Sequence, residues 1–161
     1  MANDVELILG EHPRLLDERY RVSLPPELVE PLTTDGIECV LAKERPGCLS
    51  LWNKPQWQPA LDQGIDLVRG KIRAGRMEGR LAQVQLLGRL LSTRHKDVKI
   101  AGRGRLLIPE GFREFLGVEK GQEVIVVGAA MCVEIWKPET WFSYLEKRIP
   151  RFRQLFEKLS G

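Results

Sequence analysis

The sequence predicts a mainly β protein with helices, an α+β fold in which two copies of one unit are joined by a helical link. Three observations predict it: an internal repeat, short stretches that alternate apolar and polar residues, and two segments with apolar residues every three to four positions. The 161 residues are enough for one substantial core or two small ones, and 43% hydrophobic with 29% charged residues is ordinary for a globular chain.

The repeat emerges when the chain is compared with itself at a shift of 84 residues. All four tryptophans pair at this shift, Trp52 with Trp136 and Trp57 with Trp141, and there are nine identities in 43 ungapped positions. The other identical pairs are Arg19/Arg103, Arg21/Arg105, Pro25/Pro109, Glu30/Glu114, Leu32/Leu116, Val40/Val124 and Cys48/Cys132. Residues as rare as tryptophan do not all pair at one shift by chance, so the chain contains two copies of one structural unit.

Each copy is expected to open with a strand, a tight turn, a second strand and a proline, over residues 16–25 and 100–109. A short helix follows over residues 109–117 of the second copy, whereas Pro31 is expected to end its counterpart in the first. Two more strands come next, at 39–42 and 48–52 or at 124–127 and 132–136. A helix then begins near Trp57 or Trp141.

The predicted organisation is a first repeat over 5–58, a helical link over 59–96, a second repeat over 97–143 and a C-terminal helical tail over 144–161. The helical pattern of the link runs from Pro59 to about Lys99, and glycines are expected to divide it. The apolar residues of the tail share one side of a helix that Pro150 kinks. We expect that side to pack on the protein's own core, with packing on a neighbouring subunit as the alternative.

Positive charge is concentrated in the middle of the chain. Residues 69–113 hold twelve basic and three acidic side chains, a net +9, whereas residues 1–68 carry −6 and the whole chain carries +3. Such a stretch suits a polyanionic partner, although a solvated helix face with a basic loop would have the same charge.

Composition excludes several classes of protein. No apolar run approaches the roughly 20 residues that span a bilayer, and the N-terminus lacks the pattern of a secretory signal. Cys39, Cys48 and Cys132 are expected to be buried free thiols in a reducing cytoplasm, and neither His12 nor His95 stands near a cysteine pair. With no phosphate-binding loop and no nucleophile beside a histidine, we expect no catalytic residue, cofactor, metal or small-molecule substrate.

The repeated hairpin resembles the AbrB-type swapped-hairpin DNA-binding module. The resemblance rests on Gly104-Arg105-Leu-Leu-Ile-Pro109 in the second copy and on the spacing of Asp17 and Arg21 in the first. The tandem arrangement, with Glu-Ile-Trp136 and then Trp141, resembles the MraZ family of bacterial transcriptional regulators over about residues 5–145. It implies that the two halves interleave into one pseudo-two-fold swapped-hairpin β-barrel and that the chains assemble into homo-oligomeric rings.

The resemblance also implies a function and a place in the cell. Such a protein binds double-stranded promoter DNA upstream of its own cell-division and cell-wall gene cluster and represses it. It would be cytoplasmic and associated with the nucleoid, with no membrane attachment.

The residues expected to contact DNA lie in and around the two hairpins. A guanidinium group at an exposed turn can donate paired hydrogen bonds to guanine or phosphate, glycine permits a left-handed turn, and an aspartate can fix the direction of the arginine. The predicted DNA-binding residues are Arg14, Asp17, Arg19, Tyr20, Arg21, Lys99, Arg103, Gly104 and Arg105, and His95 and Lys96 would widen the surface.

Each hairpin departs from the family pattern at one position. Tyr20 stands where glycine is usual, and a positive φ costs tyrosine about 1–2 kcal/mol, so either the turn takes another shape or Tyr20 stacks on a base or sugar. Ala101 stands where aspartate is usual and leaves Arg105 without a carboxylate partner. Two alternatives stay open: that Arg21 and Arg105 merely brace the barrel, and that the chain is an oligomeric scaffold or antitoxin-type protein-binding module with degenerate DNA contacts.

Overall fold

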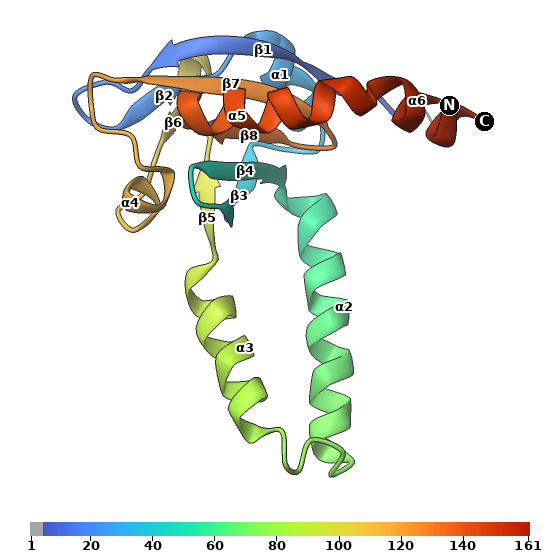
Figure 1. Ribbon diagram of the computed structural model, residues 1–161. Coiled ribbons are helices and arrows are strands. Elements are labelled where there is room, and N and C mark those ends of the chain that lie inside the picture. Colours follow the sequence, from blue (N-terminus) through green and yellow to red (C-terminus); the bar gives the residue numbers. More distant parts are fainter. Residues whose placement is uncertain (1–4) are drawn as a thin grey trace.

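The computed structural model describes residues 5–161 and has the predicted α+β composition (Figure 1). In chain order its elements are β1 (Ile8–Leu15), β2 (Arg21–Ser23), α1 (Pro26–Leu32), β3 (Glu38–Arg45), β4 (Cys48–Asn53), α2 (Lys54–Arg73), α3 (Leu81–Thr93), β5 (His95–Lys99), η1 (Gly102–Gly104), β6 (Arg105–Leu107), α4 (Phe112–Leu116), β7 (Glu123–Ala130), β8 (Val133–Trp136), α5 (Pro138–Arg148), η2 (Ile149–Arg151) and α6 (Phe152–Ser160).

The strands form one antiparallel sheet of six in the order β1-β7-β8-β4-β3-β5 and a separate pair, β2-β6. The expected closed barrel is wrong. Strands β1 and β5 lie at opposite edges of the six-stranded sheet, and the three-residue strands β2 and β6 pair with each other instead of joining those edges. Two strands this short have too few backbone groups to bond each other and also to close the sheet.

The two halves of the chain nevertheless share every layer of the structure. Strand β1 pairs with β7, β4 with β8, and β2 with β6, so each of these pairings joins one repeat to the other. The strand order also reads the same from both edges when each strand is replaced by its counterpart in the other repeat. The duplicated sequence therefore folds around one shared sheet.

The main core lies between this sheet and the β2-β6 pair, and both halves supply it. Its fully buried side chains include Leu16, Val22, Leu28, Leu41, Leu49, Leu106, Ile108, Leu116, Val126 and Ile135. A smaller cluster on the opposite face of the sheet contains Trp136 and lies beneath α5, which contributes the buried Trp141. Because burial of each large aliphatic side chain contributes about 1.5–3 kcal/mol, separating the halves would remove most of the stabilisation of both.

The three cysteines are free and buried, as predicted. Burial raises the pKa of the Cys39 thiol to about 11 and that of the Cys132 thiol to about 12. Such thiols are protonated at neutral pH and poorly reactive.

Helices α2 and α3 form an arm that extends away from the sheet (Figure 1), and neither has a buried residue. Gly75 and Gly79 take positive φ in the connection between them, whereas Gly70 stays within α2. The helical pattern predicted as far as Lys99 ends earlier, because His95–Lys99 forms β5 against β3. Within residues 5–161 no helix is both long and apolar enough to cross a lipid bilayer.

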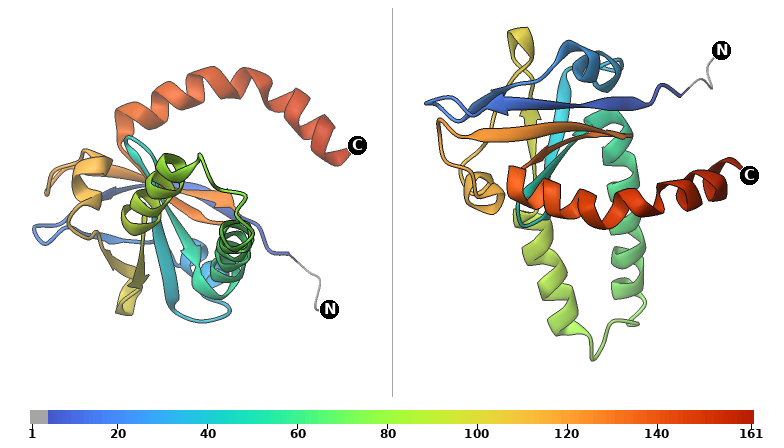
Figure 2. Two further views of the ribbon diagram at one scale, coloured as in Figure 1. Left: turned by 90° about the horizontal axis from the view of Figure 1, so that it is seen from below. Right: turned by 45° about the horizontal axis from the view of Figure 1, so that its top comes forward.

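Two expectations about prolines and helices need correction. Pro31 does not end α1, which continues to Leu32 because the buried side chain of Leu32 holds the last turn on the core. Pro150 does divide the C-terminal helix, at η2, but the helix beyond it does not pack on the protein's own core. After η2 the chain continues beyond the body formed by the sheet (Figure 2), so α6 has no buried residue.

Candidate nucleic-acid interface

The β2-β6 pair brings the two repeated arginines onto one surface. Arg21 pairs with Leu107 and Ser23 with Arg105, while Val22 and Leu106, which pair between them, are completely buried. Because side chains alternate along a strand, the residues flanking this buried pair point outward on the same side. Arg21 and Arg105 are therefore diagonal neighbours, with their Cα atoms roughly 7–8 Å apart. We call this outward face, with the turns at 17–20 and 101–104, the arginine ribbon.

The two turns lie at opposite ends of the arginine ribbon. Since β2 and β6 run antiparallel, the turn that carries Arg19 is beside Arg21, and the turn that carries Arg103 is beside Arg105. Both Arg19 and Arg103 are exposed. Four guanidinium groups thus follow one another along a single short ribbon.

Asp17 organises the first turn. Its Oδ1 accepts the backbone N–H groups of Arg19 at 2.8 Å and Arg21 at 2.9 Å, and its Oδ2 accepts Arg21 Nε at 3.0 Å. These bonds, above all that from the Arg21 backbone, hold the pKa of Asp17 below its usual range. The bond expected between Asp17 and the Arg21 guanidinium is present. Within residues 5–161 no hydrogen bond engages the two terminal nitrogens of Arg21, so they remain available to a ligand.

The second turn repeats the backbone of the first without the carboxylate. Asp17 N–H donates to Arg21 O at 2.9 Å and Tyr20 N–H to Asp17 O at 3.0 Å; the equivalent bonds of Ala101 and Gly104 measure 2.8 and 3.1 Å. Alanine offers no side-chain acceptor, and among the described residues Arg105 forms no ion pair. The guanidinium group of Arg105 is therefore less constrained than that of Arg21.

Tyr20 keeps the left-handed conformation of the glycine it replaces. Its φ is 59°, close to the 71° of Gly104, so the expectation of a differently shaped turn is wrong at this residue. The tyrosine ring compensates for the strain by contacts: the Arg113 guanidinium lies 4.1 Å from its centroid, and the ring packs against the main core. One face of the ring is therefore occupied within the free protein.

Gly104 is held where no side chain fits. A Cβ there would lie 2.6 Å from the carbonyl oxygen of Leu24, whose N–H donates to Gly104 O at 2.8 Å. On the other side of the ribbon the Ile108 N–H donates to Tyr20 O at 2.9 Å. These two bonds extend the β2-β6 pairing into both turns, so the ribbon and its turns form one unit.

The remaining predicted residues surround the ribbon unequally. Arg14 ties β1 to β2, because its Nε donates to Ser23 O at 3.1 Å. Lys99 is exposed at the end of β5, opposite Glu38. His95 lies at the other end of β5, where its ring is 4.8 Å from that of Trp57, so it does not join the ribbon.

Sequence reasoning missed two groups at the ribbon. Arg113, which sits over Tyr20, comes from α4 and has no sequence signal. Leu107 is 51% exposed on the outward face beside Arg21, although it was taken as part of an apolar run. The alternation of buried and exposed residues in β6 is the signal that identifies it.

Away from the ribbon, β8 carries a half-buried carboxyl group, that of Glu134, which accepts Trp136 Nε1 at 3.0 Å. Burial, reinforced by the nearby Glu44, raises its pKa. No third acidic, histidine or cysteine side chain joins such a group to form a metal cluster anywhere in residues 5–161. We therefore interpret Glu134 as a structural residue.

Replacing Glu134 with glutamine is expected to raise the free energy of unfolding at neutral pH by on the order of 1 kcal/mol, because the buried group then carries no charge. The folded-state pKa of Glu134 is above its unfolded value, so the stabilisation from its proton is complete at low pH and is lost as the pH rises through the folded pKa. The advantage of Glu134→Gln should therefore widen from pH 4 to pH 8 in urea unfolding, with the exposed Glu157→Gln as the control. A constant difference would contradict this.

Comparison with known proteins gives one matching family. The family described as "MraZ protein, putative antitoxin-like" matches residues 93–159. This segment contains β5, the second turn of the ribbon, β6 and the C-terminal helices.

Curated relatives extend the similarity to nearly the whole chain. A protein of Heliobacterium modesticaldum named "Transcriptional regulator MraZ" is 29% identical over 95% of this chain and 96% of its own length. Proteins with the same name from Syntrophomonas wolfei and Pelotomaculum thermopropionicum are 27% and 28% identical, each over 95% of this chain and 96% and 95% of their own lengths. The similarity therefore includes both repeats.

Proposed function

Because this chain belongs to the MraZ family, we propose that it is a transcriptional regulator that binds double-stranded DNA in a sequence-specific way through the arginine ribbon. The observation that carries the proposal is the register of β2 and β6, which puts Arg21 and Arg105 side by side and facing outward. The major groove of B-DNA admits a two-stranded β-ribbon, and arginine reads guanine there through O6 and N7.

The two halves of the ribbon have different roles in this proposal. Arg21 is held by Asp17 and loses little side-chain freedom on binding, so it supplies the more selective contact. Arg105 adapts to the base or phosphate that it meets. Arg19, Arg103 and Lys99 contact phosphates at the ends of the ribbon, and Arg14 and Tyr20 hold its shape.

We also propose that the shared sheet and the β2-β6 pair are the swapped-hairpin arrangement of two tandem AbrB-type repeats, related by a pseudo-two-fold axis between Arg21 and Arg105. The pairing of β1 with β7 and of β2 with β6 supports it. A DNA site with two similar but unequal halves would match such a ribbon.

The biological role that we propose follows the family resemblance. The chain would repress its own cell-division and cell-wall gene cluster, act in the cytoplasm at the nucleoid, and need no cofactor, metal or catalytic residue. A homo-oligomer, closed into a ring, would present several ribbons to one DNA and add their weak contacts together.

Binding to the chain's own upstream DNA is expected to depend steeply on salt. If four guanidinium groups neutralise four phosphates, affinity should fall about 10²-fold between 50 and 200 mM salt. Fluorescence anisotropy with the upstream fragment measures this, and a scrambled fragment of equal length is the control. Equal binding to both fragments would exclude sequence-specific regulation, and a flat salt response would exclude phosphate contacts by the ribbon.

A protein-binding scaffold or antitoxin-type module is the second candidate. It is favoured by Ala101, which deprives Arg105 of an orienting carboxylate, and by the uncovered apolar side of α6. It predicts no difference between upstream and scrambled DNA.

A further inference from the structure

The last helix of the chain carries an apolar side that nothing covers. Phe152, Phe156 and Leu159 are 64%, 60% and 77% exposed, and they follow one another at helical spacing with Leu155 beside them. The rings of Phe152 and Phe156 lie 5.7 Å apart. Helix α6 extends beyond the body of the molecule (Figure 2), so this side stays in water within one chain. Four large apolar side chains in a row are typical of a surface that binds another protein.

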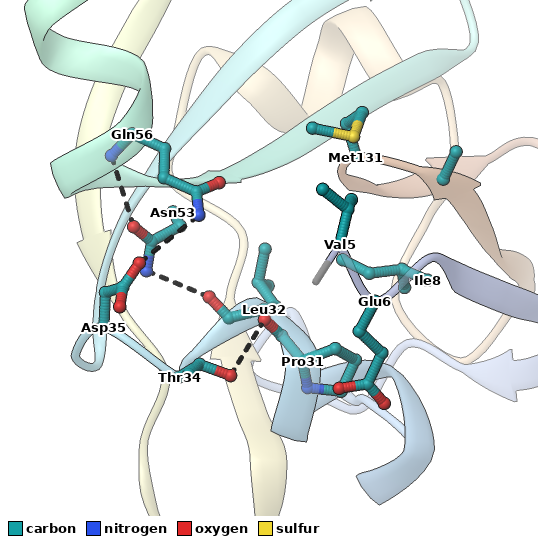
Figure 3. A pocket seen from close by; sticks show the side chains of 11 residues that line it. Val5, Glu6, Ile8, Pro31, Leu32, Thr34, Asp35, Asn53, Gln56 and Met131 are labelled. Atoms are coloured by element: carbon teal, nitrogen blue, oxygen red, sulfur yellow. Dashed lines mark hydrogen bonds between the residues drawn. The ribbon is translucent and has the colours of Figure 1, made fainter. Parts of the chain in front are cut away.

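The same chain has a hollow that could receive such a helix. A cavity of about 760 Å³ opens between the start of β1, the end of α1 and the β7-β8 turn, with Val5 and Met131 on one side and Asp35 and Gln56 on the other (Figure 3). Through Gln56 and Met131 it continues into a second hollow of about 430 Å³ that contains Trp52 and Trp57. We call the two together the Met131 groove.

The groove is formed in advance. Asn53, only 5% exposed, donates to Leu32 O at 3.0 Å and accepts the N–H of Gln56, which fixes the end of α1 against the start of α2. A helix that docks here therefore meets walls that need little rearrangement.

The repeat explains why the groove lacks a cover. Trp52 and Trp57 are the counterparts of Trp136 and Trp141, which are 2% and 8% exposed because α5 folds back over the sheet. In the first repeat the equivalent helix, α2, instead leaves the sheet and forms the arm (Figure 1). The first repeat thus lacks the apolar helix that covers the second.

Charge also matches the helix to the groove. Residues 144–161 carry five basic and two acidic side chains, a net +3. The rim of the larger cavity carries Glu6 and Asp35, both exposed, and no basic residue among its lining. In the smaller hollow Arg94 is the one cation, and Glu44 lies 3.5 Å from it. A cationic amphipathic helix is therefore a better occupant than an acidic or neutral one.

We propose that α6 of one copy docks in the Met131 groove of a second copy. Phe152 and Phe156 would enter the groove, and Arg151 and Arg153 would face Glu6 and Asp35. The two surfaces are different, so each copy donates a helix and accepts another, and such head-to-tail contacts form a ring when the rotation closes. The inference names the contact within the homo-oligomer proposed above and does not depend on DNA binding.

Complementation between two variants tests this interface without DNA. Phe152→Glu/Phe156→Glu removes the donor helix face, and Met131→Glu, at a side chain 53% exposed, blocks the groove with little effect on the fold. In sedimentation velocity the wild type should exceed the 18.4 kDa of one chain, and each variant alone should be monomeric. A mixture of the two retains one intact contact and should form a dimer that grows no further.

The controls separate this outcome from others. Phe142→Glu, at an equally exposed aromatic residue on α5, should leave the wild-type assembly unchanged, and circular dichroism should give the same helix content for all variants. A mixture that stays monomeric would overturn the proposal and indicate that α6 pairs with α6. A monomeric wild type would also overturn it, since α6 would then cover its own groove or await another protein.

Discussion

Replacing Arg21 and Arg105 together with alanine is expected to weaken binding to the upstream DNA by about 2–6 kcal/mol, a loss of at least about 30-fold in affinity. Both side chains point outward from the β2-β6 pair, and each can donate a bidentate contact to guanine or phosphate. The fold should remain intact, since the buried pair between them, Val22 and Leu106, is untouched. Loss of the exposed ion pair between Asp17 and Arg21 costs no more than about 1 kcal/mol of stability.

The single variants should differ from each other. Arg21→Ala is expected to cost more affinity than Arg105→Ala, because Asp17 has already ordered the Arg21 side chain. Arg89→Ala, at an exposed residue of α3 on the arm, is the matched control and should bind as the wild type does. Anisotropy titrations of all four variants at one salt concentration provide the measurement. An unchanged affinity in the double variant would remove the arginine ribbon from the proposed function.

The repeat in the sequence predicts how the ribbon is built, because identical residues at one shift occupy equivalent places in two interleaved halves. Arg21 and Arg105 are equivalent in this way, and so are the hydrogen bonds of their turns. What the repeat does not predict is the contact between the halves. Whether β2 pairs with β6, and whether the sheet closes, depends on strand lengths and edges that one copy alone does not determine.

The edge strands and the tail show two other limits. Strand β5 has one or two inward residues, such as Val98, in a basic stretch, so its alternation is too short to compete with the helical pattern before it. The ungapped shift also fails locally: Leu15 lies opposite Glu123 but Lys99 lies opposite Glu38, which moves the equivalence from 84 to 85 residues. One extra residue before β7 is invisible when the comparison allows no gap.

Periodicity identifies an apolar side of a helix but not its partner. The tail has the pattern of a helix that packs on a core, and Trp141 does pack there. Beyond η2 the same pattern continues into α6, where the side is exposed. The expectation about the tail failed at that point because a partner in a second copy leaves the same sequence signal as a partner within the chain.

Replacing Gly104 with alanine is expected to lower the free energy of unfolding by about 2–4 kcal/mol, which is a loss of roughly 5–15 °C in melting temperature. Two effects add. The φ of 71° is unfavourable for any residue with a Cβ, and that Cβ would lie 2.6 Å from the Leu24 carbonyl oxygen. Relieving the contact would break the bond from Leu24 N–H to Gly104 O that joins the two halves of the ribbon.

Gly102→Ala is the matched control two residues away. Its added Cβ would meet no atom within 4 Å, and its φ is not positive, so stability should stay within about 0.5 kcal/mol of the wild type. Thermal unfolding followed by circular dichroism distinguishes the two variants. Equal melting temperatures would mean that the second turn relaxes freely, and the ribbon would then not be the rigid unit on which the orientation of Arg105 depends. Tyr20 shows that a left-handed residue with a side chain is tolerated in this fold only where its ring gains contacts such as that with Arg113, and an alanine methyl at residue 104 gains none.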